Sequence, residues 1–169
     1  DNGAAIQAPI KILNCNAGFK GRKGTLYEGG IRVPFIVNQP GMVPIQTLDN
    51  LIYFPDMMPT LAALAKGTKH LPKQINGINI LPLFYGKQVD TDNRLLYWEF
   101  PGKQRAARKG DWKCVTIHPN QPLELYNLKE DPEETNNLAK KYPRRVKEFD
   151  EEMQRMHIPT PNWPQPGEQ

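Results

Sequence analysis

The stretch Gly21-Arg22-Lys23-Gly24-Thr25-Leu26-Tyr27-Glu28-Gly29-Gly30-Ile31-Arg32-Val33-Pro34 decides how the rest of the sequence is interpreted. Its four glycines surround a lysine and an arginine. A backbone without Cβ atoms can approach a small ligand closely. A lysine held by such a loop delivers a compact positive charge to an oxyanion. The same residue types also make ordinary solvated connections, so the surrounding sequence has to decide between the two interpretations.

Segments on both sides of this stretch provide that context. The stretch closely resembles the second signature of the sulfatase family, whose fold belongs to the alkaline phosphatase superfamily. An Asp-Asn-Gly triplet stands upstream at the distance typical of the family, as residues 1–3. Further segments that resemble the family are Phe54–Leu61, Ile78–Leu83, Gly110–Lys113 and Glu124–Glu134. The resemblance extends from residue 1 to about residue 158.

The resemblance and the residue pattern together predict an α/β fold. It would be the C-terminal part of an alkaline-phosphatase-like fold, ending in a small antiparallel sheet packed with a long helix. Residues 1–93 are expected to form the C-terminal edge of the catalytic domain, residues 94–158 the sheet subdomain with its helix, and residues 159–169 an extended tail. Strands are predicted at 95–100, 105–108, 112–117 and 124–127, with breaks at Gly110 and Asn120.

Helices are predicted at two places. The first has Asp56 as its N-cap and ends near Lys66, before Gly67. Its predicted buried face consists of Met57, Met58, Leu61, Leu64 and Ala65. The second helix begins at Pro143, and its apolar stripe is Val146, Phe149, Met153 and Met156. A short strand is also predicted at 32–38, restricted to an edge or a strand start by Pro34.

The resemblance implies roles for individual residues. Asp1 and Asn2 correspond to the ligands of a divalent cation, usually Ca²⁺, for which hard oxygen atoms are suitable. Lys23 corresponds to the lysine that contacts the sulfate group, where its charge would offset negative charge in the transition state. Glu28 and Arg32 are interpreted as structural, through an ion pair or backbone contacts that hold the Gly-rich turn.

Glu99 and Arg105 are candidates for binding substrate. They belong to the segments Trp98–Phe100 and Lys103–Arg108, which the resemblance places beside the substrate cleft. Such residues could recognise the sugar or aryl group of a sulfate ester, and a sulfated carbohydrate is the expected substrate. Aromatic and charged residues are also ordinary on the edge strands of a small sheet.

The family's nucleophile has no counterpart in this sequence. It is a formylglycine made from the Cys or Ser of a Cys/Ser-x-Pro/Ala-x-Arg motif. Cys15 is followed by Asn-Ala-Gly, Cys114 is followed by Val-Thr-Ile, and the sequence contains no serine. Both cysteines are expected to be unpaired and partly buried. The expectation is therefore a longer enzyme truncated just before Asp1, with the present chain inactive alone.

The three histidines match no family site. His70, His118 and His157 are each expected at the surface, because they fall in predicted loops or at a helix end.

Composition narrows the classes of partner. The chain has 169 residues and a formal net charge of +4, which suits an anionic ligand. No RNP-like signature, zinc-finger spacing or long Lys/Arg run is present, so nucleic acid is not an expected partner. No apolar run approaches the ~18 residues of a membrane span.

Two other functions remain open at this stage. One is a phosphodiesterase or phosphonate hydrolase of the same superfamily, and the other is a non-enzymatic module that binds sulfated glycans. The family resemblance implies an exported (periplasmic or extracellular) or lysosomal protein.

Overall fold

The computed structural model describes residues 3–5, 14–100, 104–118 and 120–160. Two compact units emerge from the contacts within the chain. One contains Asp1–Pro34 together with Leu95–Gln169, and the other contains Phe35–Arg94. The domain boundaries expected from the sequence, after residues 93 and 158, concern the intact protein and stay a prediction.

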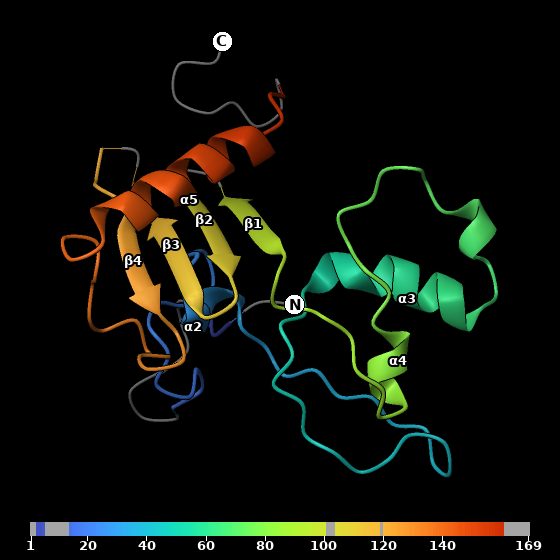
Figure 1. Cartoon of the computed structure of the whole chain (residues 1–169). Helices are drawn as coiled ribbons and strands as arrows, with labels where there is room; N and C mark the ends of the chain where they lie inside the picture. The colour runs from blue at the N-terminus through green and yellow to red at the C-terminus, as the bar shows by residue number, and fades with distance from the viewer. Residues whose placement is uncertain (1–2, 6–13, 101–103, 119, 161–169) are drawn as a thin grey trace. The chain divides into compact units, whose positions relative to one another are not determined.

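The first unit is built on a four-stranded antiparallel sheet (Figure 1). Its strands are β1 (Leu95–Phe100), β2 (Gln104–Lys109), β3 (Trp112–Thr116) and β4 (Glu124–Asn127), in that order across the sheet. Each strand is hydrogen-bonded to the next one along the chain, which is the simplest antiparallel connection. The predicted sheet is confirmed, and its strand boundaries agree with the sequence pattern within one residue.

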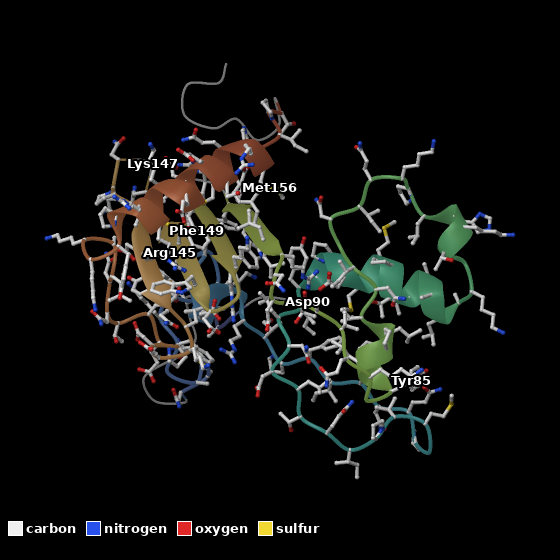
Figure 2. The ribbon with its side chains drawn as sticks, viewed as in Figure 1. Tyr85, Asp90, Arg145, Lys147, Phe149 and Met156 are labelled. Atoms are coloured by element: carbon white, nitrogen blue, oxygen red, sulfur yellow. The ribbon has the colours of Figure 1, made fainter. Side chains whose placement is uncertain are left out.

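Side chains that alternate along the strands form a separate apolar cluster on each face. On one face, Ala107, Cys114 and Leu125 pack against Phe149 and Met153. These last two residues belong to α5 (Pro143–Met156), which lies across this face of the sheet (Figure 1). Figure 2 shows the Phe149 side chain between α5 and the strands.

The predicted helix stripe is therefore confirmed except at its end. Val146 also packs against the cluster, but Met156 is 37% exposed. Met156 is the last residue of α5 and lies beyond the side chains that form this cluster.

On the other face of the sheet, the Gly-rich segment supplies the covering residues. Leu26 and Tyr27 pack against Ala106, Val115 and Tyr126. A single helical turn, α2 (Glu28–Ile31), follows them directly. The segment singled out by the sequence is thus packed onto strands that lie more than 70 residues further along the chain.

The second unit contains η1 (Phe54–Asp56), α3 (Met57–Leu64), η2 (Thr68–His70) and α4 (Leu81–Phe84). Asp56 occupies the N-cap position of α3, as predicted, but its carboxylate does not cap the helix. The carboxylate is fully buried and accepts hydrogen bonds from the backbone N–H groups of Tyr53 and Ile78. Both of its oxygens also lie 2.6 Å from the guanidinium of Arg94. Asp56 therefore joins three segments of this unit.

Two predictions for this part of the chain are wrong. On α3, Met58, Leu61 and Leu64 are each more than half exposed, and the buried residues are Pro59 and Thr60. The reason is that α3 packs on its Thr60 side, where the hydroxyl accepts a hydrogen bond from Ile80 N–H. The predicted strand at 32–38 is also absent, because these residues pair with no strand that the structure describes.

Candidate functional site

The Lys23 side chain stands at the tip of a tight turn. Thr25 N–H and the Thr25 hydroxyl both donate to the carbonyl of Arg22, at 3.0 and 2.9 Å. Gly24 has a φ of +92°, a backbone conformation that favours glycine. The Lys23 side chain is exposed and forms no ion pair with any residue that the structure describes. The turn therefore holds its backbone firmly and presents the ammonium outward.

Gln104 at the start of β2 fastens this turn to the sheet. Its Nε2 donates to the carbonyl of Gly24 at 2.9 Å, and its Oε1 accepts from the N–H of Leu26 at 3.2 Å. The Gln104 side chain is almost buried, so these bonds are shielded from water. Sequence reasoning placed Gln104 beside the cleft and missed this role, because no local pattern reports a contact across such a distance in sequence.

Residues 3–5 lie directly beside the Lys23 turn. The N–H of Gly3 donates to the carbonyl of Gly30 at 3.0 Å, and the N–H of Lys23 donates to the carbonyl of Ala4 at 3.0 Å. A Cβ on Gly3 would meet the carbonyl oxygen of Gly29 at 1.8 Å, so the two segments are in backbone contact. The predicted metal ligands Asp1 and Asn2 lie outside the described residues.

A buried cluster of charges lies beneath the turn, against the sheet. The Nζ of Lys113 is 2.9 Å from Oε1 of Glu28 and 2.9 Å from Oε1 of Glu134. The other oxygen of Glu134 accepts the backbone N–H of Glu28 at 2.7 Å. Burial raises the pKa of Glu134 above its ordinary value, although Lys113 opposes this shift.

The guanidinium groups of Arg32 and Arg108 lie 3.8 and 3.7 Å from Oε2 of Glu28. The predicted structural role of Glu28 and Arg32 is confirmed.

A second polar cluster anchors the same segment to β4. The hydroxyls of Tyr27 and Tyr126 donate to Oε2 of Glu124 at 2.7 and 2.6 Å. The ammonium of Lys20 lies 3.3 Å from that oxygen and 4.1 Å from the centre of the Tyr27 ring.

Protonation in this cluster follows from its contacts. Burial would raise the pKa of Glu124, but the hydrogen bonds from the two tyrosines and the charge of Lys20 outweigh it and lower the pKa. Burial, followed by the bond to Glu124, raises the pKa of both tyrosines.

Glu99 and Arg105 lie opposite one another on β1 and β2. They point to the α5 face of the sheet, since they alternate with residues that face the Lys23 turn. Arg105 forms an ion pair with Asp150 of α5 at 3.4 Å. Glu99 contacts the ring of His157 and the hydroxyl of Tyr97. The structure thus does not bring these two candidates together with Lys23, and their role in substrate binding stays a prediction.

The histidine predictions are confirmed at two positions. His70 and His118 are exposed, but the His157 side chain is only 13% exposed because it packs against Glu99. The two cysteines are unpaired, as predicted, but the prediction that both are partly buried is wrong. Cys15 is exposed, whereas Cys114 is fully buried in the sheet, and burial raises the pKa of its thiol to about 12. A thiol in that environment is not a nucleophile at neutral pH.

Among the described residues, no group of three or more His, Cys, Asp or Glu side chains is arranged to hold a metal ion. None of the helices in the described part of the chain combines the length and the apolar character needed to cross a membrane.

Comparison with known proteins gives one consistent result. The family model described as N-sulphoglucosamine sulphohydrolase, C-terminal, matches residues 19–158. A sulfatase of Formosa agariphila is 30% identical over 168 residues, covering 84% of this chain and 30% of that protein. The N-acetylgalactosamine-6-O-sulfatase of Bacteroides thetaiotaomicron is 29% identical, covering 79% of this chain and 29% of that protein.

Solved structures agree with this result. The crystal structure of Ps i-CgsB superimposes with a TM-score of 0.78 at 25% identity, covering 96% of this chain and 36% of its own. The B. thetaiotaomicron protein BT33336S-sulf, from a study of glycosaminoglycan metabolism, has a TM-score of 0.72 at 28% identity, covering 82% and 32%. The chain therefore spans only about a third of the length of the relatives it matches.

Proposed function

The chain belongs to the sulfatase family, as a C-terminal portion, and from that premise we propose that the intact protein hydrolyses sulfate esters with Lys23 at the sulfate group. The observation that carries the proposal is the exposed ammonium of Lys23 on a turn whose backbone is held by Ala4 and Gln104. The ion pair of Lys113 with Glu28 fixes the helical turn that follows in the sequence. A cation held in place before the reaction stabilises developing negative charge without reorganisation.

In this proposal Lys23 binds and neutralises the sulfuryl oxygens. Because its side chain has no ion-pair partner in the described structure, its charge is available to an anionic ligand. The turn supports the ammonium, and Gln104 prevents the turn from moving away from the sheet. The nucleophile, a formylglycine by family resemblance, would come from a part of the intact protein outside this chain. We expect the chain alone to be inactive.

Calcium remains part of the proposal through Asp1 and Asn2. Carboxylate and amide oxygens are suitable ligands for Ca²⁺, which takes six to eight of them. Two residues cannot complete such a site, so further ligands would come from the rest of the intact protein. Gly3, the next residue in the sequence, contacts Gly30, which is the observation that supports this part of the proposal. When bound, the ion would add positive charge at the sulfate group.

The exposed apolar side of α3 favours an incomplete catalytic domain over a self-contained glycan-binding module. A module that folds alone would bury Met58, Leu61 and Leu64, each of which is more than half exposed here. The chain spans about a third of the length of these relatives, so in this proposal residues outside the chain would cover the helix.

For the substrate we propose a sulfated carbohydrate. The N-acetylgalactosamine-6-O-sulfatase among the relatives carries a sulfated sugar in its name, which supports this class; other relatives are named arylsulfatases, so an aryl sulfate is the competing substrate. The alternative, a phosphodiesterase or phosphonate hydrolase of the same superfamily, is disfavoured because the matching relatives are named sulfatases. By family resemblance we keep the expectation of an exported or lysosomal protein.

The test uses the intact protein with sulfate, phosphate and phosphonate esters of the same alcohol. Sulfate-ester hydrolysis should dominate, and Lys23→Ala should lower kcat/KM by about 10²–10³-fold. Arg22→Ala is the matched control, since Arg22 is an exposed cation in the same turn. Equal losses of kcat/KM in the two variants would show that the positive charge of the turn acts in general, without a specific contact between Lys23 and the sulfate group. Faster hydrolysis of the phosphate or phosphonate ester would overturn the proposal.

A further inference from the structure

An open pocket of about 520 Å³ lies on the α5 side of the sheet, where β3, β4 and the segment before α5 meet. Its apolar wall consists of Trp112 and Tyr142, whose ring centres are 5.3 Å apart with an angle of 75° between the ring planes. Tyr142 is 36% exposed. Aromatic rings that are partly open to water are common binding surfaces for the apolar face of a ligand. The pocket therefore offers an apolar wall beside polar groups.

Two cations without an ion-pair partner among the described residues border this aromatic wall, and a third one nearby, Lys147, is paired with Glu151. The segment Lys140-Lys141-Tyr142-Pro143-Arg144-Arg145-Val146-Lys147 carries five cations and no acidic residue. The guanidinium of Arg145 lies 4.2 Å above the Trp112 ring, and the ammonium of Lys141 is 5.3 Å from the centre of the Tyr142 ring. Neither cation has an ion-pair partner among the residues that the structure describes. By contrast, Lys20, Arg94 and Lys113 are all paired with carboxylates.

Stacking on Trp112 holds the Arg145 guanidinium in place while its N–H groups stay available. Guanidinium groups bind oxyanions such as sulfate through parallel hydrogen bonds, and prior orientation lowers the entropy lost on binding. Arg145 does not itself line the pocket, but it is held as an anion receptor against Trp112, which does.

The rest of the lining is suited to hydroxyl groups. Asn127, Glu130 and Asn136 bring amide and carboxylate groups to the pocket. The carboxylate of Asp131 is already used, since it accepts the N–H groups of Thr135 and Asn136 at 3.0 and 2.8 Å. Carboxylates repel anionic groups but accept hydrogen bonds from sugar hydroxyls, so a bound sugar would turn its hydroxyls to Glu130 and its sulfate to Lys141 and Arg145. The combined chemistry is that of a sugar ring with hydroxyls and a sulfate substituent.

We propose that this pocket binds a sulfated sugar unit of a polymeric substrate. The proposal rests on the proposed function and extends it to a second contact with the same polymer. The pocket includes Trp112, which faces α5, whereas the Lys23 turn covers the opposite face of the sheet. A sugar bound here is therefore a different unit from the one held by Lys23, and only a chain of sugars could occupy both.

The experiment measures binding of the intact protein to dextran sulfate, with unsulfated dextran as the reference, by affinity electrophoresis. Arg145→Gln should weaken binding to dextran sulfate about tenfold, through loss of a charge-assisted contact. Tyr142→Ala should weaken it about fivefold, and Tyr142→Phe should retain the wild-type affinity. Lys147→Gln is the charge-matched control, because Lys147 lies on the same helix, is 79% exposed and pairs with Glu151 (Figure 2).

Each outcome decides the proposal separately from the proposed function. Equal weakening by Arg145→Gln and Lys147→Gln would show a non-specific charge effect and overturn it. Equal affinity for dextran and dextran sulfate, or no change with any variant, would also overturn it. Hydrolysis of a small aryl sulfate should be the same in wild type and Arg145→Gln, because that ester cannot reach both sites. Absence of all hydrolysis contradicts the proposed function but leaves the binding result interpretable.

Discussion

The ammonium of Lys113 lies 2.9 Å from Oε1 of Glu28, and its side chain is fully buried. Lys113 belongs to β3 and Glu28 to α2, so this ion pair joins the sheet to the segment that carries Lys23. Glu134, also fully buried, completes the cluster from a loop after β4. Three parts of the chain that are distant in sequence therefore depend on one buried ammonium.

Removing that ammonium should destabilise the protein strongly. Lys113→Met leaves Glu134 buried without an ion-pair partner among the described residues and leaves Glu28 only the more distant Arg32 and Arg108, which costs about 3–5 kcal/mol. Urea unfolding of the intact protein measures this change in the free energy of unfolding. The exposed Lys109→Met on β2 is the control and should change it by less than about 0.5 kcal/mol. Adding Glu28→Gln and Glu134→Gln to Lys113→Met should recover part of the loss, and no recovery would contradict the ion-pair explanation.

Glu124 should make the free energy of unfolding decrease at low pH. Its pKa in the folded state is lowered from the ordinary 4.5, so the folded state binds fewer protons than the unfolded state in this range. The resulting stabilisation is fully present above the ordinary pKa and is lost as the pH falls through the lower folded value. Glu124→Gln should therefore flatten the decline in stability below pH 4.5 relative to wild type. Thermal unfolding at several pH values tests this, and parallel curves for the two proteins would refute it.

Gln104 should act on catalysis through Lys23. Gln104→Leu removes both bonds to the turn, and a displacement of the ammonium should lower kcat by about 10–100-fold. Combined with Lys23→Ala, the second substitution should have little further effect, because both remove the same contact. A lower melting temperature with unchanged kcat would indicate a purely structural role. Fully additive losses in kcat would show that Gln104 affects catalysis independently of Lys23.

Gly30 should not tolerate a side chain. A Cβ at this position would lie 2.0 Å from the carbonyl oxygen of Thr25, which belongs to the turn itself. We expect Gly30→Ala to cost about 1–3 kcal/mol of stability through this overlap. Gly67→Ala is the matched control, since its nearest neighbour would be 3.8 Å away. Comparable losses in the two variants, measured by denaturant unfolding, would contradict the packing argument.

Local patterns predicted the sheet and its covering helix well. Each strand of residues 95–127 has its own run of strand-forming residues and a turn signal, so its boundaries depend on near neighbours. The stripe on α5 follows from helical spacing in the same way, and it failed only at Met156, where the helix ends. The same reasoning failed on α3. The spacing of its apolar residues indicated an apolar face, but it does not specify whether another segment of the chain packs on that face.

The sequence by itself determined the family, the strand and helix pattern of residues 95–156, and Lys23 as the candidate for the sulfate group. These conclusions depend on short motifs and on periodicity, which are local properties. Only the tertiary structure decided that Gln104 and Lys113 hold the Lys23 segment, that Glu99 and Arg105 face α5, and that Arg145 stacks on Trp112. Each of these contacts joins residues from separate segments. The physical reason is that such contacts arise from packing and charge pairing between folded segments, which no local pattern specifies.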